Sequence, residues 1–271
     1  MQRRVCSQVM QLEGQQITKT ATLRLLSELE ASEEEWTTIY LTPQSAQPRM
    51  SRLFSERTAD PRVVEIAGII EDGAVQRALE RFYTGLVLFH SKDAVHALVP
   101  PLAIREDAAT RGPANTTPLR EMLEVTYRTV IVLVTWGAYI LALYEGSDIL
   151  VYRKGTGHIH KHHKKGGSSQ ARFQRRTEEQ RREFLKRAGT RIDEYLGGQK
   201  ADHLFFGGNR LILRPLRSQS RFMDENADIT SVRTLQAKRG DRDALDAAIY
   251  EAYSSIHFQP VAAEPEDVQE L

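Results

Sequence analysis

Hydrophobic positions along the first hundred residues follow helical and strand patterns. Apolar residues recur with helical spacing over 17–35 and over 61–83, which predicts one helix in the first range and one or two in the second. A cluster of β-branched and aromatic residues predicts a strand at 36–41, and the apolar runs 85–90 and 94–100 predict a hairpin. Together these elements predict an N-terminal α/β domain.

The second half of the chain has the pattern of a mixed sheet with flanking helices. The nearly continuous apolar run 129–135 is typical of a strand covered on both faces. Thr177 and Gln180 fit a capping box for a helix that ends near Leu196, although the helix could begin earlier. The remaining expected elements are strands at 138–144, 149–153, 203–206 and 229–235, and helices at 118–127, through Leu211 and Leu216, and at 242–255. The predicted fold class is therefore α/β of the mixed, α+β kind.

A polar stretch at 106–117 contains a glycine and a proline and lacks apolar periodicity. Segments of this composition commonly join domains. The sequence therefore predicts an N-terminal domain at 1–116, a second domain at 117–257 and an acidic, mobile tail at 258–271.

The composition of the chain limits the number of domains and excludes several classes of protein, but it does not indicate a binding partner. The chain has 271 residues, of which 41% are hydrophobic, enough for one large domain or two small ones. Cys6 is the only cysteine, which excludes an internal disulfide and a cysteine-based zinc cluster. No apolar run reaches the roughly 18 residues that a membrane helix needs. We therefore expect a cytoplasmic protein without a membrane partner.

Positive charge is concentrated between positions 153 and 191, although the formal net charge of the chain is only +1. Such a patch suits a polyphosphate backbone, because each neutralised phosphate releases condensed counterions. The alternative is a solvated helix face with internal ion pairs, but most of these cations lack a local partner. The cations are Arg153, Lys154, Lys161, Lys164, Lys165, Arg172, Arg175, Arg176, Arg181, Arg182, Lys186, Arg187 and Arg191.

The same region contains a glycine-rich loop with a histidine cluster. Glycines at 155, 157, 166 and 167 permit tight backbone approach to another molecule, whereas a plain flexible linker is the alternative. The histidines of the sequence HIHKHH at 158–163 suit zinc, nickel or copper. No cysteine or carboxylate lies nearby to complete such a site, and the neighbouring lysines would repel a cation. We therefore expect no metal and no cofactor, and we see no Ser-His-Asp triad.

The run 129–200 resembles the middle domain of archaeal and eukaryotic class-I peptide-chain release factors. That domain has a β-meander, a glycine loop containing Gly-Gly-Gln, and a long basic helix packed on the sheet. Here the loop and helix read GTGHIHKHHKKGGSSQARFQRRTEEQRREFLKRAG, and DHLFFGG at 202–208 resembles the strand and turn that follow in the family. The likeness extends more loosely to His257. The chain thus resembles a bacterial member of this superfamily.

One departure from the family pattern narrows the resemblance. Ser168 follows Gly166 and Gly167 where the family has glutamine, and Gln170 stands two positions later. The resulting Gly-x-x-Gln form is similar to that of the Vms-type peptidyl-tRNA hydrolases, which free stalled chains during ribosome quality control.

The resemblance implies hydrolysis of peptidyl-tRNA in the peptidyl-transferase centre of the large ribosomal subunit. Gln170 would position water and stabilise the oxyanion, and Gly166, Gly167, Ser168 and Ser169 would form the catalytic tip with it. The partners would be the ribosome and peptidyl-tRNA, not DNA, and no stop-codon-reading motif is present. The residues expected to contact RNA are Lys161, Lys164, Lys165, Arg172, Arg175, Arg176, His160, His162 and His163.

Two other functions remain open on the sequence. The same fold could cut tRNA near its 3′ end with a histidine as acid or base. The displaced position of Gln170 also fits a non-catalytic protein that binds ribosomes or tRNA.

Overall fold

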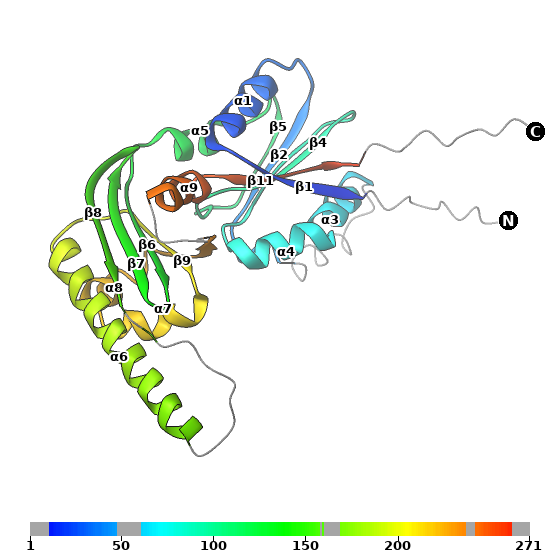
Figure 1. Cartoon of the computed structure of the whole chain (residues 1–271). Coiled ribbons are helices and arrows are strands. Elements are labelled where there is room, and N and C mark those ends of the chain that lie inside the picture. Colours follow the sequence, from blue (N-terminus) through cyan, green and yellow to red (C-terminus); the bar gives the residue numbers. More distant parts are fainter. Residues whose placement is uncertain (1–10, 48–60, 158, 160–168, 237–241, 262–271) are drawn as a thin grey trace, which may run out of the picture. The chain divides into compact units, whose positions relative to one another are not determined.

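The computed structural model of the protein describes residues 11–47, 61–157, 159, 169–236 and 242–261 (Figure 1). The chain divides into two compact units with one sheet each, and the whole is an α+β protein with eight helices in its described part. Residues up to Glu124 and from Tyr253 onward form the first unit, and Val125–Ala252 forms the second.

The first unit is built on a six-stranded antiparallel sheet of order β1-β11-β4-β3-β2-β5. Alternation along β3 gives both faces a core: Leu86 and Leu88 face one cluster, and Val87 and Phe89 face the other. The strands are β1 (Leu12–Ile17), β2 (Trp36–Leu41), β3 (Leu86–His90), β4 (Val95–Val99), β5 (Ala108–Gly112) and β11 (Ser255–Pro260). The predicted strand at 36–41 and the hairpin of β3 and β4 are confirmed.

Four helices of the described segments cover the two faces of this sheet. Helix α4 (Gly73–Phe82) buries Val75, Leu79 and Phe82 in one cluster. Helices α1 and α5 bury leucines in the other. The helices are α1 (Lys19–Glu30), α3 (Pro61–Glu71), α4 and α5 (Thr117–Glu124). The helical region predicted at 61–83 is thus two helices, with Asp72 as the N-cap of the second because its carboxylate accepts from the Ala74 and Val75 amides.

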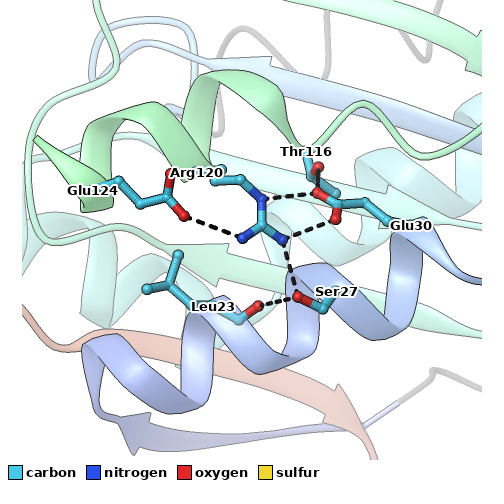
Figure 2. A network of polar contacts seen from close by, with 6 residues as sticks. All are labelled: Leu23, Ser27, Glu30, Thr116, Arg120 and Glu124. Atoms are coloured by element: carbon cyan, nitrogen blue, oxygen red, sulfur yellow. Dashed lines mark hydrogen bonds and ion pairs between the residues drawn. The ribbon is translucent and has the colours of Figure 1, made fainter.

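Helix α5 belongs to the first unit, which moves the boundary from the position expected at 116/117. A polar network binds α5 to α1 (Figure 2): Arg120 donates to both carboxylate oxygens of Glu30, at 3.0 and 2.9 Å, and to the Ser27 hydroxyl. The Thr116 hydroxyl also donates to Glu30. These hydrogen bonds hold the pKa of Glu30 below its usual value. The polar stretch at 106–117 is not a linker, since β5 pairs with β2 along the sheet edge.

The C-terminal segment also differs from the expected tail. Residues 255–260 form β11, which pairs with β1 on one side and β4 on the other and buries Phe258. The expected domain limit at 257 therefore falls inside a strand. Residues 262–271 lie outside the described residues.

The second unit has a five-stranded mixed sheet of order β10-β9-β6-β7-β8. Strands β6, β7 and β8 form an antiparallel meander, and β9 and β10 run parallel to β6. Central strand β6 is buried at nearly every position, as its continuous apolar run predicted. The strands are β6 (Arg128–Thr135), β7 (Ala138–Glu145), β8 (Asp148–Thr156), β9 (His203–Gly208) and β10 (Thr230–Leu235).

Helices α6 and α9 lie on opposite faces of this sheet. Val130, Val132 and Val134 of β6 join the core under α6, whereas α9 contacts β6 and β10. The Arg153 guanidinium of β8 stacks on the ring of Tyr195 in α6. The adjacent residue of β8, Tyr152, is covered by the guanidinium of Arg242 in α9. The helices are α6 (Ser169–Leu196), α7 (Arg210–Arg217), α8 (Arg221–Glu225) and α9 (Arg242–Ala252). Across the described ranges, no helix combines the length and apolar character needed to cross a membrane.

Candidate functional site

The root of the glycine-rich loop is closely packed. Tyr139 lies opposite Gly155 in the β7–β8 register, and a Cβ at Gly155 would stand 2.3 Å from the tyrosine ring. A Cβ at Gly157 would stand 2.7 Å from Phe184 of α6, and the Gly157 amide donates to the Gly137 carbonyl at 2.8 Å. These two glycines therefore serve close approach of backbone to aromatic rings, and the flexible-linker interpretation fails at this end of the loop.

Most of the expected loop tip lies outside the described residues. This applies to the catalytic-tip residues Gly166, Gly167 and Ser168 and to the expected RNA contacts His160, Lys161, His162, His163, Lys164 and Lys165. Ile159, immediately before them in the chain, is half-buried and packs on the core of the second unit. Their roles remain expectations from the sequence.

Ser169 and Gln170 are the first two residues of α6. The first four amides of a helix have no carbonyl partner within the helix, so the Gln170 N–H falls among those left available for another acceptor. The aligned peptide dipoles add partial positive charge at this end. Gln170 thus follows the loop directly, and its place in a helical backbone fixes the direction of its backbone N–H.

Helix α6 starts earlier than the capping-box pattern suggested. Thr177, the expected N-cap, lies buried within the helix, and it is the first buried residue among the described side chains of α6. Beyond it the predicted inward stripe is confirmed, with Phe184, Leu185, Ala188, Ile192 and Leu196 all buried. Figure 1 shows the N-terminal end of α6 extending away from the sheet.

Three arginines occupy this projecting end. Arg172, Arg175 and Arg176 are exposed, and none of them forms an ion pair with a described carboxylate. The segment 169–176 therefore carries positive charge into solvent without compensation from its own helix. Contact of these three residues with RNA stays a prediction.

Aromatic rings pack between α6 and the meander of β6, β7 and β8. The sequence analysis did not predict these contacts. Phe184 lies between Trp136 and Tyr139, with ring centroids 6.5 and 6.3 Å away. The Arg181 guanidinium stands 4.8 Å from the Trp136 ring. Burial raises the pKa of the Tyr139 phenol. The one local signal was an aromatic residue opposite a strand glycine, a pairing in which the ring covers the exposed backbone.

The described residues offer no metal centre. Among them no group of three or more histidine, cysteine, aspartate or glutamate side chains is placed to hold an ion. The histidines at 158, 160, 162 and 163 fall in the part of the chain that the structure leaves undescribed.

Several solved structures are similar to the chain at low identity. An archaeal translation termination factor, aRF1, is 19% identical, with 87% of this chain and 72% of that chain covered and a TM-score of 0.34. Pelota from Archaeoglobus fulgidus is 7% identical over 83% and 58% of the two chains, with a TM-score of 0.31. Dom34 from S. cerevisiae is 8% identical over 88% and 65%, with a TM-score of 0.29. Likeness this distant carries no conclusion about activity.

A family comparison is more specific. No curated protein matches the chain. The sequence model described as "Actinobacteria/chloroflexi VLRF1 release factor" matches residues 127–255, a region that contains the whole second sheet, the glycine-rich loop and α6. Residues 127–255, which make up the second unit and the start of β11, are thus similar to the Actinobacteria/chloroflexi VLRF1 release factors.

Proposed function

We propose that the protein releases nascent peptides by hydrolysing the ester of peptidyl-tRNA on stalled ribosomes or large subunits, without reading a codon. The observation that supports this most is the position of Gln170. It stands at the start of a helix that carries the exposed Arg172, Arg175 and Arg176, directly after the glycine-rich loop. The family match over 127–255 includes both parts.

The reaction needs a water molecule inside a site built of RNA. Water attacks the ester carbonyl, the bond to the terminal ribose oxygen breaks, and the developing negative charge falls on the carbonyl oxygen. A backbone N–H at a helix start is a suitable donor to that oxygen. The Gln170 side-chain amide would position the water. Because an amide has no useful pKa, the proton transfers are assigned to the terminal ribose and ribosomal RNA.

The flanking residues would deliver Gln170 to this site. Gly166 and Gly167 would let the loop enter the peptidyl-transferase centre, with Ser168 and Ser169 completing the tip. Arg172, Arg175 and Arg176, with Lys161, Lys164 and Lys165, would contact RNA phosphates, and the loop histidines would lie beside them. The N-terminal unit has no part in the chemistry under this proposal.

A release assay with labelled peptidyl-tRNA on stalled ribosomes tests the proposal. The wild-type protein should yield free peptide and intact tRNA. Gln170→Ala should lower the rate by roughly 100-fold or more, the scale of losing a group that acts on the transition state. Gln174→Ala is the matched control, because Gln174 is exposed on the same helix and bonds only to Glu178 among the described residues.

Each other outcome assigns a different function. Peptide still attached to a short tRNA fragment would indicate an endonuclease. Ribosome binding with the ester left intact would indicate a non-catalytic binding protein. Equal rates for wild type and Gln170→Ala would remove Gln170 from the mechanism.

A further inference from the structure

A groove of about 700 Å³ runs between edge strand β8 and helix α6, at the root of the loop. Its lining is strongly positive: Arg153, Lys154, Lys186, Arg187 and Arg191 face Glu183 and Glu194. The volume is within the roughly 300–1,000 Å³ of sites that hold a small-molecule-sized group. The lining cations belong to the basic stretch 153–191, but none of them is among the loop and helix residues to which the sequence assigned contact with ribosomal RNA.

Four of the five cations are available to a ligand. Arg191 donates to Glu194 at 2.6 Å and is thereby neutralised. Arg153, Lys154, Lys186 and Arg187 form no ion pair among the described residues. Clustered cations without partners repel one another, so an anion bound in the groove would reduce their electrostatic repulsion.

One of these side chains, Arg153, is held in place before any ligand arrives, and Arg187 lies close to the backbone at the loop root. The Arg153 guanidinium stacks 4.4 Å from the Tyr195 ring and donates to the Tyr152 carbonyl. Arg187 reaches over Gly157, where a Cβ would stand 3.2 Å from its Nη2. A preorganised guanidinium loses less rotamer freedom on binding phosphate than a free one.

The positive charge continues from the groove toward the helix start. Arg172, Arg176, Gln180, Glu183, Arg187 and Arg191 are spaced three or four residues apart and therefore share one face of α6. From Arg172 to Arg191 this face extends roughly 28 Å, at about 1.5 Å per residue. A polymeric anion fits an elongated face of this kind better than a single small anion.

We propose that the groove and this face of α6 bind a strand of RNA through its phosphates. The rings nearby do not offer stacking, because Tyr139 is buried and Tyr195 is covered by Arg153, so binding is independent of base identity. The strand would hold the root of the loop while the tip reaches the ester. This role rests on the proposed function, whereas RNA binding itself can be measured without it.

Fluorescence anisotropy of the full-length protein with labelled A12 and U12 oligonucleotides, across a series of salt concentrations, tests the proposal. Both oligonucleotides should bind alike. The double variant Arg153→Gln, Arg187→Gln should bind about 10-fold more weakly at low salt. Its plot of log affinity against log salt should be shallower by about 1.4, since each neutralised phosphate of a single strand contributes roughly 0.7. The exposed pair Arg77→Gln, Lys92→Gln in the first unit is the matched control and should change neither quantity.

Failure of this proposal and failure of the proposed function give different results. Gln170→Ala should lose release and keep the wild-type salt dependence. The groove variant should raise the protein concentration needed for half-maximal release and leave the maximal rate unchanged. An unchanged slope in the groove variant, or an equal change in the control pair, would overturn the RNA site.

Competition identifies the occupant. Displacement by polyglutamate at the same charge concentration as RNA would assign the groove to an acidic polypeptide, and displacement by millimolar inorganic phosphate would assign it to a small anion. Either result overturns the proposal. If the arginine pair fails to fold by circular dichroism, the exposed Lys154→Gln, Lys186→Gln pair replaces it with the same expected slope.

Discussion

At the scale of single residues, the loop root depends on glycine for space. The space in which a Cβ of residue 155 or 157 would lie is occupied by the ring of Tyr139 or Phe184, respectively. Both rings belong to the core that α6 covers. A side chain at either position would displace a ring from β7 or from α6, so these two glycines connect the loop to the packing of the whole second unit.

We therefore expect Gly155→Ala to destabilise the second unit by about 1–3 kcal/mol, the usual cost of forcing an extra group into a packed site. Urea unfolding followed by tryptophan fluorescence measures this, because Trp136 lies beside Phe184. Gly68→Ala is the control: nothing lies within 4 Å of its Cβ, and alanine in helix α3 should stabilise by roughly 0.5–1 kcal/mol. Equal midpoints for wild type and Gly155→Ala would contradict the packing argument.

At the scale of elements, the pairing of β4 with β11 brings two histidines together. His96 Nδ1 and His257 Nε2 stand 3.0 Å apart, and the rings are stacked with centroids 5.2 Å apart. Burial and the neighbouring His96 lower the pKa of His257 to about 4. Burial also lowers the pKa of His96, against the opposing effect of Glu28 and Glu34. Both rings are therefore held neutral by the fold.

This pair should make the first unit sensitive to acid. Unfolded histidine has a pKa near 6.5, so below that value the unfolded chain binds protons that the folded chain excludes. The contribution of this pair to the free energy of unfolding should be constant above about pH 6.5. It should fall by up to about 1.4 kcal/mol per pH unit for His257 as the pH drops toward 4. Urea midpoints at pH 7.5, 6 and 5 measure the slope, and a slope that His257→Gln leaves unchanged would assign it to other groups.

At the scale of the whole molecule, the chain leaves the first unit after Glu124 and returns to it at Tyr253. The returning strand β11 is internal to the first sheet, between β1 and β4, and Ser255 and Phe258 are buried. The second unit is thus an insertion between two segments of the first. The fold of the first unit requires both ends of the described chain.

Truncation tests this arrangement. Ending the chain after Ser254 removes β11, leaves β1 and β4 with unpaired edges and opens the core around Phe258, so we expect the first unit not to fold. Ending the chain after Val261 keeps every described strand and is the control, with an unchanged unfolding midpoint. Hydrogen exchange of β2 and β3 amides reads the first unit separately. Full protection in the shorter protein would refute the role of β11.

Local periodicity was enough to predict the elements that bury a face. The apolar run of β6, the β-branched and aromatic residues of β2 and the inward stripe from Phe184 to Leu196 were all visible in the sequence. The Gly-x-x-Gln motif and the concentration of charge also came from sequence alone, and the family match covers the region that contains them.

Tertiary structure decided the rest, because it depends on partners far away along the chain. Strands β1, β5 and β11 have few apolar residues and are defined by ladders to distant strands, so the sequence showed a linker and a tail where the fold has sheet. The β8–α6 groove likewise arises only when an edge strand and a helix, joined through the loop, pack side by side. The hydrophobic periodicity of a segment indicates which of its faces is buried. Strand pairing and the formation of a groove depend instead on the segments that the fold places beside it.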